Sequence, residues 1–106
     1  MTDVVVVLTT VPDDARGEAL ARQLVAERLA ACASLYPPMI SFYRWKGQIA
    51  REPERQLVVK TTQASLPALK TRLAQLHPYE LPELLALPAE AGAEYLAWVN
   101  EETGGL

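Results

Sequence analysis

The apolar positions of the chain change their spacing several times, and each change predicts a new element. Residues 3–9 (DVVVVLT) form a continuous β-branched run, which is typical of a strand buried on both faces of a sheet. Pro12, Asp13 and Asp14 then interrupt the pattern, and an aspartate is favoured just before a helix. Apolar residues at helical spacing follow, so the sequence predicts a helix that ends at about Ala31.

An aromatic and β-branched stretch at residues 32–45 predicts a long strand. Pro37 and Pro38 interrupt it, and they cannot both lie in a central ladder because proline lacks an N–H donor. We therefore expect a bulge or a bend of the strand at these two residues.

A turn at 46–47 and a charged segment at 51–55 separate that strand from residues 56–62 (QLVVKTT), which predict the returning strand. The resulting hairpin projects further than the core of a small domain needs. Its apolar side chains are too many to leave in water, so we expect a partner chain to cover them. They are Ile40, Phe42, Tyr43, Trp45 and Ile49.

The last third of the chain predicts two helices around a short strand. Ser65 is suited to cap the first of these helices, which must end near His77 because the residue before a proline is pushed out of the helical region. Residues 83–88 (ELLALP) predict a short buried strand, and residues 92–101 predict a third helix. Residues 103–106 are expected to fray. The apolar side of the third helix comprises Tyr95, Trp98 and Val99.

The order of these elements is strand, helix, strand, strand, helix, strand and helix. It predicts one α+β domain over residues 1–106 with the split βαβ pattern (βαββαβ) of ferredoxin-like folds. A long hairpin between the second and third strands and an extra C-terminal helix complete the predicted architecture.

Composition narrows the class of protein. The chain has 106 residues, of which 50% are hydrophobic, enough for one small core. Its net charge is −3 and no Lys/Arg cluster stands out, so no nucleic-acid partner is expected. No apolar run approaches the roughly 20 residues that span a bilayer, so no membrane partner is expected either. The first ten residues carry an acid where a signal peptide is basic, which favours a cytoplasmic location.

One histidine and one cysteine limit the chemistry that a single chain can carry. They cannot build a disulfide within the chain or a usual structural zinc site. For His77 taken alone, a helix-end role that complements the dipole is favoured over metal ligation or proton transfer. For Cys32, a buried small apolar role is favoured over a nucleophile, because nothing in the sequence brings a base near it.

Other polar positions leave more than one interpretation open. Lys60 interrupts an apolar strand, and it either points inward to an anionic partner or faces solvent. Trp45 either ends the hairpin or inserts into a neighbouring subunit. Glu80 and Glu83 lie three apart with Pro82 between them, a spacing that says little about acid–base catalysis. Because no glycine-rich phosphate loop or GxSxG motif occurs, no catalytic residue is predicted.

The chain carries five short motifs: ERLAAC (27–32), SFYRWKGQI (41–49), LVVKTT (57–62), LHPYELPELLALP (76–88) and YLAWVN (95–100). In this order and at this spacing they resemble the CutA family of divalent-cation tolerance proteins, from about Val4 to Glu101. The resemblance implies a ferredoxin-like protomer in a tight homotrimer, in which long hairpin strands extend the sheets across subunits.

The resemblance also implies a role in tolerance of divalent metal ions, notably copper, without a required cofactor or a defined enzymatic reaction. Clefts between subunits are the expected sites, where metal ions or a small ligand would bind. The residues at the family's motif positions are Cys32, Tyr43, Trp45, Lys60, His77, Tyr79, Pro82 and Glu83. The expected polar contacts and aromatic walls of such a cleft come from Lys60, His77, Trp45 and Tyr79.

Copper ligation in some members of that family uses a cysteine at the end of the first strand and two consecutive histidines before Pro-Tyr. The matching positions of this chain hold Thr9, Leu76 and His77. A copper site here would therefore rest on His77, with Glu83 or Cys32.

Three alternatives remain beside the metal-binding trimer. The first is a signalling trimer like the PII regulators, which bind nucleotide in comparable clefts but carry a long effector loop. The second is a scaffold whose trimerisation is itself the function. The third and least favoured is a small hydrolase with Cys32 as its nucleophile.

Overall fold

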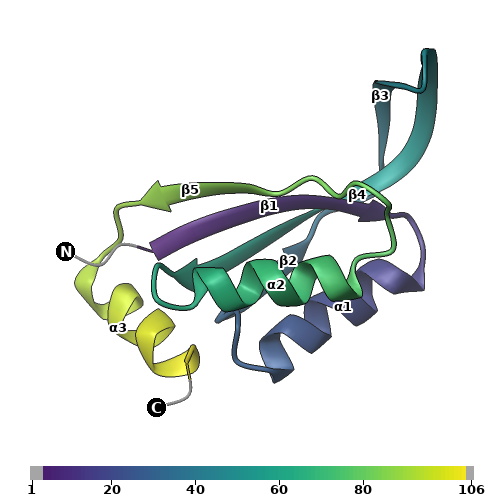
Figure 1. Ribbon diagram of the computed structural model, residues 1–106. Coiled ribbons are helices and arrows are strands. Elements are labelled where there is room, and N and C mark those ends of the chain that lie inside the picture. Colours follow the sequence, from purple (N-terminus) through teal and green to yellow (C-terminus); the bar gives the residue numbers. More distant parts are fainter. Residues whose placement is uncertain (1–3, 105–106) are drawn as a thin grey trace.

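The computed structural model describes residues 4–104, which form one antiparallel sheet with two helices packed on one of its faces (Figure 1). The elements in chain order are β1 (Val4–Pro12), α1 (Ala15–Ala26), β2 (Cys32–Leu35), β3 (Met39–Trp45), β4 (Gln48–Thr62), α2 (Leu66–Leu76), β5 (Leu85–Ala89) and α3 (Ala93–Glu102). The strand order is β2-β4-β1-β5, and β3 pairs with β4 beyond that path. This order confirms the predicted ferredoxin-like α+β fold. Asp3, where the first strand was predicted to begin, lies outside the described residues.

The core lies between the sheet and the helices α1 and α2. Alternate residues of β1 and β4 point to this side and meet leucines of both helices, as the strand and helix periodicities predict. Burying one such side chain contributes about 1.5–3 kcal/mol. The most deeply buried members are Val5, Val7, Val11, Leu24, Leu57, Val59, Leu69 and Leu73.

The helix ends follow local chemistry. The Asp14 carboxylate accepts the backbone N–H of Arg16 at 3.0 Å, which confirms its predicted capping role at α1. The predicted C-terminal end of α1 is wrong by five residues, because the helix ends at Ala26 and Arg28 takes a left-handed φ of 61°. The predicted end of α2 is confirmed, since His77 is the extended residue that follows its last turn. Ser65 stands at the N-cap position of α2, but its side chain makes no capping hydrogen bond, contrary to the prediction.

The hairpin is longer than the sequence predicts. The charged segment 51–55 was expected to lie outside the strands, but it pairs with β3 and makes β4 a continuous strand of 15 residues. Lys46 and Gly47, which both have a positive φ, form a tight turn that brings β3 against β4. The pairing with β3 overrides the low strand propensity of the charged residues at 51–55. The break between β2 and β3 confirms the bend predicted at Pro37–Pro38. Figure 1 shows the hairpin rising well clear of the sheet.

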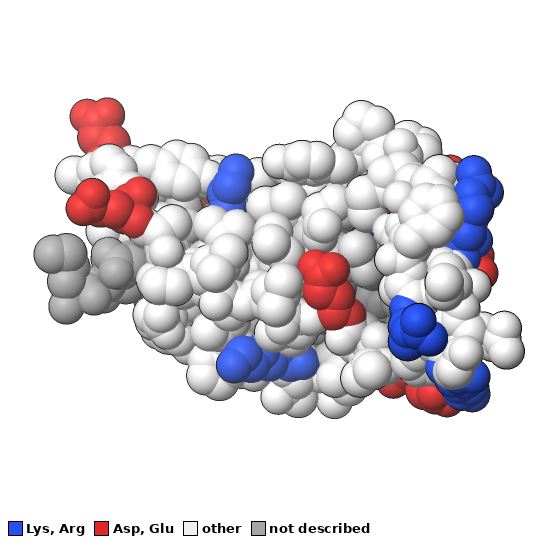
Figure 2. Space-filling view, turned by 90° about the horizontal axis from the view of Figure 1, so that it is seen from above, with Lys and Arg blue, Asp and Glu red and all other residues white. Residues whose placement is uncertain are grey.

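The second face of the sheet carries no helix over most of its width, which overturns the prediction that the short strand near residues 83–88 is buried. The short strand β5 is not buried, because Leu85 and Leu87 point to the uncovered face and are 53% and 51% exposed. On α3, only Val99 of the predicted apolar side is buried, whereas Tyr95 and Trp98 are exposed. Figure 2 shows this bare face as a surface largely free of charge.

The segment after α3 is ordered up to residue 104, contrary to the predicted fraying. The Thr103 hydroxyl is buried and donates to the Val99 carbonyl at 2.8 Å. The backbone N–H of Gly104 donates to the Arg28 carbonyl at 3.0 Å and ties α3 to the turn after α1. Residues 105–106 of that prediction lie outside the described residues. In the part of the chain that the structure describes, no helix is long and apolar enough to cross a membrane.

Candidate functional site

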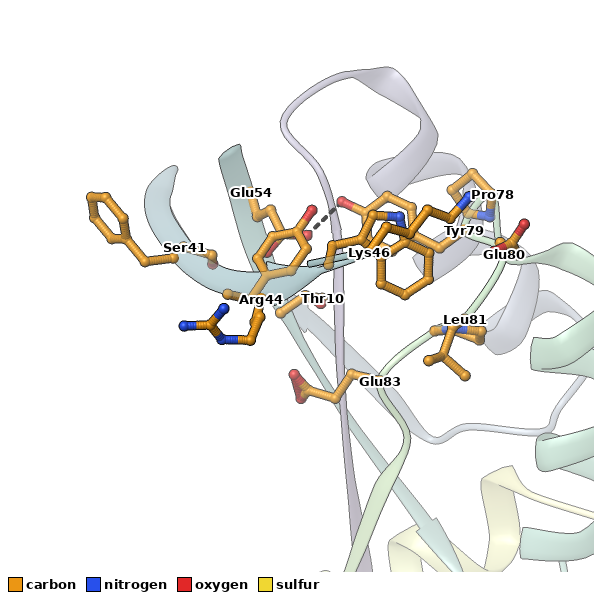
Figure 3. Close-up of a pocket in the computed structure, with 14 residues that line it drawn as sticks. Thr10, Ser41, Arg44, Lys46, Glu54, Pro78, Tyr79, Glu80, Leu81 and Glu83 are labelled. Carbon is orange, nitrogen blue, oxygen red and sulfur yellow. Dashed lines mark hydrogen bonds between the residues drawn. The ribbon is translucent and has the colours of Figure 1, made fainter. Parts of the chain in front are cut away.

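A cavity of about 860 Å³ lies where the hairpin meets the loop between α2 and β5 (Figure 3). Its floor is the end of β1 and the middle of β4, its outer wall is β3, and its other wall is residues 78–83. Four of the predicted cleft residues line it, namely Tyr43, Trp45, Tyr79 and Glu83. The hairpin and the HPYELPE motif, which are separated in sequence, therefore meet at one site.

His77 anchors the loop wall of this cavity. The side chain is 8% exposed, and its Nε2 lies 2.9 Å from the Thr10 carbonyl oxygen and 3.1 Å from the Thr9 hydroxyl. The backbone N–H of Tyr79 donates to Nδ1 at 3.1 Å. Because Nδ1 accepts and a carbonyl can only accept, the ring is the neutral tautomer with its proton on Nε2. Burial lowers the pKa of His77, although the Thr10 carbonyl and the Glu54 carboxylate act in the opposite direction.

The metal-ligand positions implied by the resemblance come together in space, but they hold other residues. The Thr9 hydroxyl touches the His77 ring, while Leu76 packs against the core. Both ring nitrogens of His77 are engaged in hydrogen bonds, so a metal ion at either one would have to replace an existing partner. Among residues 4–104, no three His, Cys, Asp or Glu side chains are arranged to hold a metal ion. Metal binding by His77 stays a prediction.

The most deeply buried acid of the cavity is Glu54, which sequence reasoning missed. It is 5% exposed, and its Oε2 accepts the Tyr79 hydroxyl at 2.6 Å (Figure 3). Burial, followed by this hydrogen bond, raises the pKa of Tyr79, so the phenol stays protonated and donates. The signal for Glu54 was strand alternation. Glu54, Gln56, Val58 and Lys60 lie at intervals of two and share one face of the strand, provided that the charged segment is recognised as strand.

Gln56 links the cavity floor to Glu83. Its side-chain amide donates to the Thr9 carbonyl at 2.8 Å and lies 3.5 Å from the Glu83 carboxylate. Glu83 is half-buried and lies at the edge of the cavity. The two acids of the cavity floor and wall are thus held by neutral donors, Glu54 by a phenol and Glu83 by an amide.

The hairpin supplies the aromatic wall. Tyr43 and Trp45 lie two residues apart on β3 and so share one face of the ribbon. The Lys46 ammonium lies 5.7 Å from the centroid of the Trp45 ring, within the range of a cation–π contact. Arg44 lies on the opposite face of the ribbon, and Figure 3 shows its side chain directed away from Glu54.

Two predicted cleft residues lie elsewhere in the protomer. Cys32 on the edge strand β2 stands opposite Lys60 on β4, and neither lines the cavity. Both belong to the bare face of the sheet, and the Cys32 thiol lies 3.6 Å from the Ser34 hydroxyl. Lys60 is half-buried there, so the solvent-facing and anion-paired interpretations both remain open.

Comparison with known proteins gives a consistent result. A family model described as "CutA1 divalent ion tolerance protein" matches residues 5–102. The chain is 49% identical to a divalent-cation tolerance protein CutA of Thermus thermophilus over 100 residues, covering 93% of this chain and 97% of that protein. It is 45% identical to the corresponding protein of Pectobacterium atrosepticum, with 94% and 92% coverage.

Solved structures agree with the sequence comparison. The fold is similar to that of CutA from Xylella fastidiosa, with a TM-score of 0.89, 46% identity, and coverage of 94% of this chain and 97% of that chain. It is also similar to CutA1 from Oryza sativa, with a TM-score of 0.91, 35% identity, and coverage of 98% and 96%.

Proposed function

Because the chain belongs to the CutA1 divalent ion tolerance family, we propose that it acts in cellular tolerance of divalent metal ions, copper above all, as a cytoplasmic homotrimer. Two relatives that are named divalent-cation tolerance protein CutA match this chain at 45–49% identity over nearly their whole length. On this proposal the chain is a binding protein rather than an enzyme.

The bare face and the hairpin support the trimer. Phe42 and Ile49 at the hairpin are 67% and 71% exposed in the single chain, and Leu85 and Leu87 add apolar surface on the sheet. Monomeric soluble proteins rarely expose large apolar patches, and contact between subunits would remove these side chains from water. This uncovered apolar surface is the observation that carries the proposed assembly.

The cavity between the hairpin and the HPYELPE loop is the proposed binding cleft. Tyr43, Trp45 and Tyr79 form its walls, Glu83 stands at its edge, and His77 lies beneath the loop. Copper binding would engage His77 with Glu83, or with a Cys32 brought close by a neighbouring subunit. An imidazole nitrogen and a carboxylate are ligands that Cu(II) accepts, but an ion at His77 must displace one of its present hydrogen-bond partners, so a site of modest affinity is expected.

Calorimetric titration with Cu(II) and Zn(II) tests the metal-binding part of this proposal. His77→Ala should lower the Cu(II) affinity by about tenfold or more, since even second-shell changes cost about 10–100-fold. Glu90→Gln is the control, because Glu90 is exposed and does not line the cavity, and it should leave the affinity unchanged. An unchanged affinity in a folded His77→Ala protein would remove His77 from any metal site.

The trimeric scaffold is the second candidate, and the same apolar surface favours it. It gains if the protein is a stable trimer that binds neither Cu(II) nor Zn(II). The nucleotide-binding alternative is tested by titration with ATP. The two-residue turn of this hairpin leaves no long loop of the kind that the PII regulators carry.

A further inference from the structure

Glu54 is a nearly buried carboxylate without a positive partner. The Tyr79 hydroxyl donates to Oε2, whereas Oε1 accepts no hydrogen bond within residues 4–104. Because no fully buried side-chain oxygen or nitrogen in these residues lacks a partner, Oε1 is open to solvent. The two ion pairs found among residues 4–104 do not involve Glu54: they join Asp14 to Arg16 and Glu27 to Arg72. Removing a carboxylate from water is costly unless a charge or several hydrogen bonds compensate it. Glu54 lines the cavity, so a cation that enters the cavity can reach its carboxylate.

The walls beside Glu54 suit an organic cation rather than a bare metal ion. Tyr43, Trp45 and Tyr79 present aromatic rings, whose negative faces attract ammonium groups. The chain already places one ammonium there, since Lys46 extends over Trp45. A divalent ion needs several oxygen or nitrogen ligands at once, and the part of the chain described here offers no cluster of three such side chains.

The charge and size of the cavity indicate which molecules it can hold. Three glutamates line it, Glu54, Glu80 and Glu83, against the two cations Arg44 and Lys46, of which Arg44 points away from Glu54. An anionic ligand would meet these carboxylates. The volume of about 860 Å³ is within the range of about 300–1,000 Å³ that is typical of small-molecule sites.

We propose that this cavity binds a small organic amine in its ammonium form. The ammonium donates to Glu54, and the apolar body of the ligand lies along Tyr43 and Trp45. This inference rests on the proposed function in that it names a ligand class for the same cleft, but it requires no metal ion. Pro78 and Pro82 each restrict the backbone of the opposite wall, which reduces the ordering needed on binding.

A charge series of three closely related probes tests the proposal on the full chain in its native assembly. The probes are 2-phenylethylamine, its neutral analogue 2-phenylethanol, and the anion 3-phenylpropionate, each titrated by calorimetry at pH 7.5. The amine should bind about tenfold or more tightly than the alcohol, and the anion should bind most weakly. Equal affinities for amine and alcohol, or no binding of the amine, would overturn the proposal.

Two substitutions assign the binding to Glu54 and the aromatic wall. Glu54→Gln keeps an acceptor for Tyr79 but removes the charge, so the preference for the amine should vanish. Glu52→Gln, two residues earlier on β4 and exposed, is the matched control and should leave the preference intact. If Glu54→Gln fails to fold, Trp45→Leu decides, since Trp45 is partly exposed and its loss should weaken amine binding several-fold.

The outcome is separable from that of the proposed function. A trimer that binds Cu(II) but shows no preference for the amine rejects this inference alone. A monomer that binds no metal rejects the proposed function. The titrations with the amine and its two analogues still test the cavity in that case. A preference for the amine that survives in a folded Glu54→Gln variant places the amine elsewhere and rejects the inference.

Discussion

The hydrogen bond between Tyr79 and Glu54 gives the sharpest test of how the cavity is built. Tyr79→Phe removes the donor at 2.6 Å from a carboxylate that is 5% exposed, and the ring keeps its packing. A hydrogen bond to a charged group contributes about 1.5–3 kcal/mol, and most of that is lost because water reaches Glu54 poorly. We therefore expect the free energy of unfolding to fall by about 2 kcal/mol per protomer.

Urea unfolding at one fixed protomer concentration measures this loss, since assembly makes stability concentration-dependent. Tyr36→Phe is the matched control, because Tyr36 is exposed and its hydroxyl has no partner among residues 4–104, so the change should stay within about 0.5 kcal/mol. A double-mutant cycle with Glu54→Gln should give a coupling energy of about 1 kcal/mol or more. A loss below about 0.5 kcal/mol for Tyr79→Phe, or strict additivity, would refute the reasoning.

Other contacts can be tested by stability measurements alone. The folded pKa of His77 lies below its ordinary value of 6.5, so the unfolded state binds more protons than the folded state near that pH. The free energy of unfolding should therefore fall as the pH drops below about 6.5, and His77→Gln should flatten this dependence. Glu27 has its pKa lowered to about 2 by Arg72, so its contribution is complete above about pH 4.5 and is lost towards pH 2; Arg72→Gln should remove that acid limb. Gly17→Ala should destabilise the protein by about 1–3 kcal/mol, because the new Cβ would lie 2.8 Å from Val11 Cγ2. This steric cost should exceed the gain from the better helix propensity of alanine, and an unchanged urea midpoint would contradict the argument.

Local signals in the sequence predicted the elements well. The β-branched run, the aspartate before α1 and the His-Pro step after α2 each act within a few residues of where they occur, so their consequences can be deduced without tertiary knowledge. The same holds for the bend at Pro37–Pro38.

The errors arose where tertiary contacts decide. The charged segment 51–55 is strand because β3 pairs with it, and strand β5 is exposed because helices cover only one face of the sheet. The early end of α1 depends on a left-handed Arg28, which a sequence pattern does not reveal.

The candidate site was half predictable. The motifs at 41–49 and 76–83 pointed to Tyr43, Trp45, Tyr79 and Glu83, which the fold does bring to one cavity. Glu54 and Gln56 escaped notice because neither residue type is unusual in a charged strand. Their importance comes from burial and from partners on distant segments, Tyr79 and Thr9.

The mass of the assembly in solution tests the central claim most directly. Sedimentation equilibrium at micromolar concentration should give three times the 11.7 kDa mass of the chain. Ile49→Asp, at the most exposed apolar residue of the hairpin, should shift the protein towards the monomer, whereas Val25→Asp on the exposed side of α1 should not. A monomer at micromolar concentration, or a trimer indifferent to Ile49→Asp, would contradict the assembly described here.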